Sequence, residues 1–150
     1  MTPGLDTAYP DASESPGLAL WRVTNAWQRR IRAALAPHDL THVQFVLLAS
    51  LTWMDRSEPV TQRDLAAFAD TDVMMTSQVI RALEAKGYVT RSPHPTDGRA
   101  VTLAPTPAGI ALANRANTDV EAADGAYFDA LAPADRESFT RHLRALDQHE

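Results

Sequence analysis

The chain has 150 residues, 45% of them hydrophobic, which favours one domain with a real core and excludes wholesale disorder. It contains no cysteine, which excludes disulfides, thiolate metal sites, cysteine nucleophiles and sensing by thiol oxidation. The net charge of −5 argues only weakly against a nucleic-acid partner, because both ends are acidic while residues 56–104 balance six acidic against six basic side chains.

Residues 1–15, rich in proline, serine, aspartate and glycine, are expected to form a flexible tail. The N-terminus has neither a basic start nor an apolar run, so we expect no signal peptide. No segment approaches the ~18 apolar residues of a membrane span. We therefore expect a cytoplasmic protein without a membrane partner.

Two helices are predicted after the tail. Ser15, followed by proline, has the character of a helix start and predicts a helix over 16–36. Thr41 and Gln44 have the spacing of a capping box, which predicts a second helix from about His42.

Two more helices, separated by the short break "DTD", are predicted in the middle of the chain. The first begins after Thr61, and the second runs over 73–86, with Asp72 as its N-cap and Gly87 as a left-handed residue at its end. The face of this second helix that we expect to pack on the core consists of Val73, Thr76, Ile80 and Leu83.

Two β-prone segments, 89–92 and 99–103, flank the turn "PHPTDG" and predict a hairpin. A lone hairpin of this size is barely stable, so we expect it to pack against the helices. Two final helices are predicted within 106–149, with Thr106 and Pro133 at their starts.

Helix, break, helix and hairpin in this order predict a winged helix-turn-helix, whose second helix enters the DNA major groove and whose hairpin is the wing. The expected fold class is mainly α with a small β-hairpin wing. The helices outside this unit carry apolar stripes that two small lobes of one chain cannot bury, which predicts a dimer.

The stretch "LAAFADTDVMMTSQVIRALEAKGYVTRSPHPTDGRAVTLAPTPAG" resembles the MarR family of bacterial transcription regulators. The resemblance covers residues 17–149 and rests on Leu83-Glu84-x-x-Gly87, Asp97-x-Arg99 and Leu103-x-x-Thr106-x-x-Gly109. It implies one domain over 16–150, with dimerisation helices within 16–36 and 106–149 and a winged helix-turn-helix over 40–104. It also implies a homodimeric repressor that binds a pseudo-palindromic operator in double-stranded DNA and is released by a small, often aromatic, ligand.

The predicted DNA-binding residues lie on the outward face of the helix over 73–86 and on the hairpin: Met74, Met75, Ser77, Gln78, Arg81, Arg91, His94 and Arg99. Glutamine can bond an adenine edge, arginine a guanine edge or a phosphate, and methionine can contact a thymine methyl. Arg99 has the charge and reach to enter a narrow minor groove. The alternatives are an ordinary solvated helix face and an Arg99 paired with Asp97.

The predicted ligand-binding residues, placed between the dimerisation helices and the winged lobe, are Trp21, His38, His42 and Trp53. The alternative for the tryptophans is packing in the core or the dimer. The five histidines lack cysteine partners and a His-Glu-x-x-His pattern, so we expect no metal and no cofactor. No phosphate loop or nucleophile motif is present, so we expect no enzyme and no catalytic residue.

Two other functions stay open. A winged-helix module that binds a protein instead of DNA is compatible with the acidic total charge and the single lysine. An enzyme on a helical fold has no supporting motif.

Overall fold

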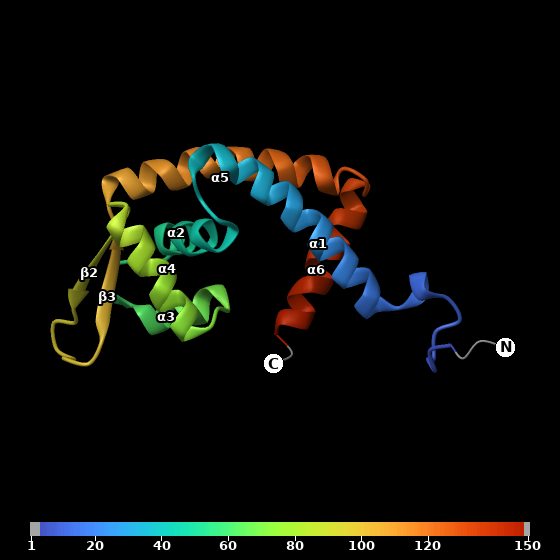
Figure 1. The fold of residues 1–150 in the computed structure, drawn as a ribbon, viewed down its shortest axis with the longest axis horizontal. Helices are drawn as coiled ribbons and strands as arrows, with labels where there is room; N and C mark the ends of the chain where they lie inside the picture. The colour runs from blue at the N-terminus through green and yellow to red at the C-terminus, as the bar shows by residue number, and fades with distance from the viewer. Residues whose placement is uncertain (1–3, 149–150) are drawn as a thin grey trace.

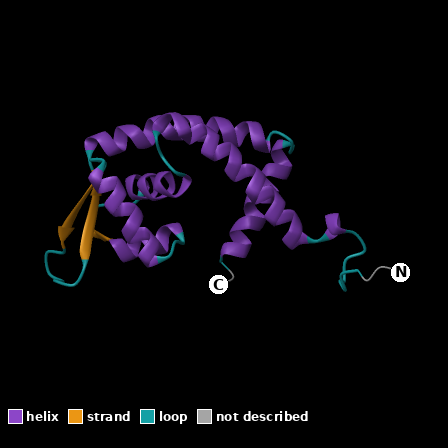
Figure 2. Cartoon of the chain, viewed as in Figure 1, coloured by secondary structure: helices purple, strands orange, loops and turns teal. Residues whose placement is uncertain are grey.

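The computed structural model describes residues 4–148 and confirms a mainly helical fold with a small β-sheet wing (Figures 1 and 2). The helices are α1 (Pro16–Leu35), α2 (His42–Trp53), α3 (Gln62–Ala69), α4 (Val73–Ala85), α5 (Pro107–Phe128) and α6 (Pro133–Asp147). The strands are β1 (Val60–Thr61), β2 (Val89–Pro93) and β3 (Val101–Pro105), and two 3-10 turns are η1 (Ala12–Glu14) and η2 (Ala36–His38). Residues 1–3 of the expected tail and 149–150 after the last helix lie outside the described part.

The predicted starts of the first two helices are confirmed by capping hydrogen bonds. The Ser15 hydroxyl accepts from the backbone N–H of Leu18 at 3.2 Å. The Thr41 hydroxyl accepts from the N–H of Gln44 at 3.2 Å, and the Gln44 side chain accepts from the N–H of Thr41 at 3.1 Å. Such bonds satisfy amide groups that have no partner inside the helix.

Helix α4 ends as predicted. Gly87 has φ of 83°, and the N–H of Tyr88 donates to the carbonyl of Leu83 at 3.0 Å while the N–H of Gly87 donates to that of Glu84 at 2.9 Å. These two bonds form a Schellman motif, which turns the chain sharply into β2.

The wing is a three-stranded antiparallel sheet in the order β1-β3-β2, where the sequence predicted only a hairpin. Strand β1 pairs Val60 with Leu103, and β2 pairs Arg91 with the same Leu103. A two-residue strand shows no alternation, so its sequence gives no strand signal. Strand β3 begins at Val101, later than the predicted start at Arg99. Arg99 belongs to the turn, which is closed by a hydrogen bond from the N–H of Ala100 to the carbonyl of Asp97 at 3.1 Å.

One apolar core joins the winged lobe, defined as residues 42–105, to α5 and the end of α1. Its fully buried large apolar side chains come from α1, α2, α3, α4 and β2: Ile31, Leu35, Leu47, Leu48, Leu51, Leu65, Ile80, Leu83 and Val89. The predicted core face of α4 is correct for three residues and wrong for Val73, which is 49% exposed. This residue is the first of its helix and lies at the edge of the lobe, beside the wing and outside the core.

Helix α5 spans the molecule along one side (Figure 1). It packs on both α1 and α2. The N-terminal half of α1 and all of α6 lie at the end away from the wing, and α6 has no buried residue. Among the described residues, no helix is both long and apolar enough to cross a membrane.

Candidate nucleic-acid interface

The face of α4 that is predicted to contact DNA is exposed to solvent. Asp72 is its N-cap, as expected, and accepts from the N–H of Met75 at 2.9 Å. Met74 and Met75 are exposed, as are Gln78 and Arg81, whereas Ser77 is half-buried. Four of the five side chains predicted on this helix are therefore free to contact a partner.

The wing turn presents Arg99 to solvent. Its backbone N–H donates to the Asp97 carboxylate at 3.0 Å, which shapes the turn. Within residues 4–148, no carboxylate lies within ion-pair distance of the Arg99 guanidinium. Asp97 therefore bonds the backbone of Arg99 and leaves the guanidinium without an ion pair.

A groove of about 510 Å³ lies between the wing, the start of α3 and the start of α4. We call it the wing groove; its lining residues are Thr61, Gln62, Arg63, Val73, Asp97, Arg99, Ala100 and Val101. Two cations and one anion line it, which gives the local positive charge that a phosphate backbone requires. The carbonyl oxygen of the Gln62 side chain is buried there without a hydrogen-bond partner in the described structure.

Arg63 belongs to the candidate interface, although the sequence analysis did not select it. It is exposed on the first turn of α3 and lines the wing groove together with Arg99. A cation on the first turn of a helix opposes the helix dipole, so its position there was a usable signal of a role outside the helix.

The other two predicted wing residues have structural contacts. Arg91 is only one-quarter exposed, and its guanidinium lies 3.7 Å from the Glu84 carboxylate. The Nδ1 atom of His94 accepts from the N–H groups of Thr96 and Asp97, both at 3.1 Å, and so braces the turn. Both residues lie on the wing, but these contacts hold part of each side chain within the protein.

A second groove, of about 440 Å³, lies between α2 and α5. We call it the α2–α5 groove, and its lining residues are Phe45, Val46, Ala49, Ser50, Thr52, Trp53, Ala113, Asn114, Asn117 and Glu121. Its size suits a small organic molecule. The Asn117 side chain donates to the Glu121 carboxylate at 3.0 Å, so the polar side of the groove is rich in acceptors. Neither arginine nor lysine is among its lining residues.

The four predicted ligand residues do not converge. Trp53 lines the α2–α5 groove and is 84% exposed. His38 lies 2.6 Å from the Asp119 carboxylate, and His42 stacks edge-on against Trp27 at 5.2 Å. Trp21 is exposed on α1. Only Trp53 among these four belongs to the groove as the structure describes it.

The surroundings of His42 change its titration. Burial lowers the pKa of His42 below its ordinary value, and the nearby Arg32 cation lowers it further. His42 is therefore held neutral over a wider pH range than a histidine in solution. In residues 4–148, no three histidine, aspartate or glutamate side chains come together as a metal site would need.

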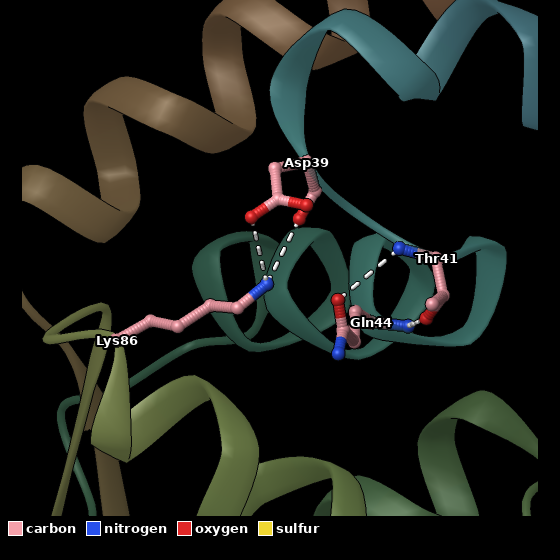
Figure 3. A network of polar contacts seen from close by, with 4 residues as sticks. All are labelled: Asp39, Thr41, Gln44 and Lys86. Carbon is pink, nitrogen blue, oxygen red and sulfur yellow. Dashed lines mark hydrogen bonds and ion pairs between the residues drawn. The ribbon is translucent and has the colours of Figure 1, made fainter.

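The winged lobe is tied to the α1–α2 turn by the single lysine of the chain (Figure 3). The Lys86 ammonium, at the end of α4, donates to the carbonyl oxygen of Asp39 at 2.9 Å and lies 3.5 Å from the Asp39 carboxylate. Asp39 itself has a left-handed backbone with φ of 54°.

The far end of the molecule exposes an apolar surface. Leu20 and Val23 of α1 face a groove of about 370 Å³ whose other lining residues include Phe139, Leu143 and Leu146 of α6. Four of these five side chains are exposed in the single chain. A contiguous apolar surface of this kind is typical of a protein interface.

Comparisons with known proteins agree with this architecture. The MarR family model matches residues 40–101. An uncharacterized HTH-type transcriptional regulator of Bacillus subtilis, YdcH, is 46% identical over 143 residues, which is 95% of this chain and 96% of that protein.

Two solved structures extend the likeness to the whole fold. Bordetella bronchiseptica BpsR, described with a mechanism for regulation of its DNA binding by 6-hydroxynicotinic acid, aligns with a TM-score of 0.85 and 25% identity, covering 95% of this chain and 100% of its own. Mycobacterium tuberculosis MarR family protein Rv2887, in complex with salicylic acid, aligns with a TM-score of 0.69 and 33% identity, covering 91% of this chain and 98% of its own. The alignments therefore include helices outside the winged lobe.

Proposed function

The chain belongs to the MarR family of transcriptional regulators, and we propose that it acts as a homodimeric repressor released from a pseudo-palindromic operator by a small aromatic ligand. It is a DNA-binding regulator by family and by fold. We assign DNA binding to residues 40–104 and dimerisation to the helices within 16–36 and 106–149, and we place the protein in the cytoplasm, where its DNA target lies. We propose no catalytic step.

The observation that supports DNA binding most strongly is the wing groove. In this groove Val73, the first residue of α4, lies beside two exposed arginines, Arg99 and Arg63. A helix in the major groove and a cationic wing beside it is how winged helix-turn-helix units contact a duplex.

The test of DNA binding is fluorescence anisotropy with the chain's own promoter fragment and with random DNA. We expect the promoter to bind at least ~10³-fold more tightly. Gln78→Ala should cost ~1–3 kcal/mol on the promoter and almost nothing on random DNA, because it removes a base contact. Equal weak binding to both DNAs would contradict the proposal and favour the protein-binding alternative.

Dimerisation is supported by the exposed apolar surface of α1 and α6. Two-fold symmetry then predicts inverted half-sites one helical turn apart, ~34–36 Å. Analytical ultracentrifugation should show a dimer at micromolar concentration. A stable, folded monomer under those conditions would refute this part of the proposal.

Ligand release is supported by the α2–α5 groove, which lies between a helix of the winged lobe and the long helix α5. A ligand there can change DNA affinity only by binding one arrangement of the two parts better than the other. Trp53 gives the measurement, because its indole lines the groove. Its fluorescence should change with an aromatic ligand in the wild-type chain, and this change should be lost in Trp53→Phe.

A further inference from the structure

The start of α4 exposes three consecutive apolar side chains. Val73 is 49% exposed, Met74 is 74% exposed and Met75 is 38% exposed. Apolar surface in water costs free energy, and three neighbouring residues of this size form a patch of the kind that binding partners cover.

This patch lies on a helix end that offers little else for recognition. No charged residue occurs in the first eight positions of α4, from Val73 to Ile80; the first is Arg81. The Thr76 hydroxyl is buried and donates to the Asp72 carbonyl at 2.8 Å. Gln78 is therefore the one exposed polar side chain over these two turns.

We propose that Met74 and Met75 recognise thymine C5-methyl groups in each operator half-site, an inference that rests on the DNA-binding function proposed above. Among the four bases, only thymine shows an apolar group in the major groove. Against any other base, a methionine would cover hydrogen-bonding groups without replacing their bonds to water. The flexible thioether chain lets methionine fit against a methyl group.

The first step of the test obtains the operator. Selection from a random double-stranded library with the full-length chain should yield inverted half-sites that carry thymine at fixed positions. If no sequence is enriched, both the proposed function and this inference fail.

The second step removes single methyl groups. Deoxyuridine in place of a contacted thymine deletes only the C5-methyl and keeps the base pair. Each replacement should weaken binding by about 4-fold, which corresponds to the ~0.8 kcal/mol of one buried CH₂ group. Thymines that flank the half-sites are the control and should tolerate the replacement.

The third step assigns the methyl contact to a side chain. In Met74→Ala, the difference between thymine and deoxyuridine at one position should fall below about 1.5-fold, whereas Met74→Leu should keep most of it. Arg99→Ala is the matched control, because it should weaken both DNAs equally. Circular dichroism should show an unchanged fold, since Met74 is mostly exposed and Asp72 caps the helix.

The result that overturns the inference differs from the failure of DNA binding. If an operator is selected but deoxyuridine binds as well as thymine at every position, the protein binds specific DNA without reading methyl groups. If the discrimination is present but survives both Met74→Ala and Met75→Ala, another residue reads the methyl group and the assignment is wrong.

Discussion

The Lys86 ammonium bonds the backbone oxygen of Asp39 more closely than the Asp39 carboxylate, at 2.9 Å against 3.5 Å. The carboxylate is almost fully exposed, so the ion pair adds little to stability. The contact between the end of α4 and the α1–α2 turn is therefore a hydrogen bond to the main chain.

This geometry predicts that two substitutions have different effects on the free energy of unfolding. Lys86→Met should lower the free energy of unfolding by about 0.5–1.5 kcal/mol, because the main-chain hydrogen bond is lost. Asp39→Asn should change it by less than ~0.5 kcal/mol, since asparagine keeps the carbonyl and tolerates the left-handed backbone. Urea unfolding of both variants is the measurement, and an equal loss in both would show that the ion pair matters after all.

Gly109, in the first turn of α5, has no room for a side chain. A Cβ atom there would overlap the carbonyl oxygen of Tyr88. The two backbones are held together because the Thr106 N–H donates to that same oxygen at 3.0 Å, and the Thr106 hydroxyl donates to the carbonyl of Gly87 at 2.7 Å.

Gly109→Ala should therefore destabilise the protein by about 1–3 kcal/mol through overpacking. Gly125→Ala, in the same helix but with open space around the position, should instead stabilise it by up to ~1 kcal/mol through helix propensity. Thermal unfolding of the two variants tests the close approach, and a stabilised Gly109→Ala would contradict it.

Arg99 should act on DNA through its charge. Arg99→Ala should keep the fold and dimer and reduce the slope of log K against log salt by about one unit. Arg99→Lys should recover only part of the affinity, because lysine lacks the planar guanidinium. The slope measured for Arg63→Ala tests the second cation of the same groove. An unchanged slope in both variants would show that the wing groove does not contact DNA.

The acceptor-rich lining of the α2–α5 groove makes a prediction about ligand charge. Glu121→Gln should strengthen binding of an aromatic carboxylate such as salicylate by on the order of 5-fold, since it removes a like charge from the groove. The same change should weaken an aromatic amine. Titrations of Trp53 fluorescence measure both, and a lack of effect on either ligand would place the effector elsewhere.

His42 should give part of the stability a pH dependence. Because its folded pKa lies below the ordinary 6.5, the unfolded chain binds the proton more strongly. Its contribution to stability is present above pH 6.5 and is lost as the pH falls through the folded pKa. Urea unfolding at several pH values should show a smaller loss toward low pH in His42→Gln than in the wild-type chain. If the unfolding free energies of the two proteins fall equally with pH, His42 is not a source of the pH dependence.

Local chemistry explains most of what the sequence predicted correctly. The Thr41–Gln44 box, the Asp72 cap and the Gly87 termination each depend on residues a few positions apart, so the sequence contains the whole signal. The periodicity of α4 located its buried face for the same reason. It failed at Val73, because a helical pattern gives no information on where the core ends.

The surroundings of the candidate site were harder to predict, for a different physical reason. Strand β1 has two residues and exists because β3 pairs with it, and Arg63 lines the wing groove because the wing turns back toward α3. The residues predicted to bind ligand come from separate segments whose packing decides what they touch: His38 contacts Asp119 on α5. Contacts between distant segments cannot be deduced from the spacing of residues along the chain.

Helix α5 has 22 residues without interruption, which makes it a rod of ~33 Å that touches both α1 and the winged lobe. A rod converts a small rotation at one end into a large displacement at the other. A tilt of about 5° over this length moves the far end by ~3 Å, close to the ~3.4 Å rise of one base pair. If a ligand in the α2–α5 groove tilts α5 by this slight angle, the winged lobe is displaced by about one base pair along a bound duplex.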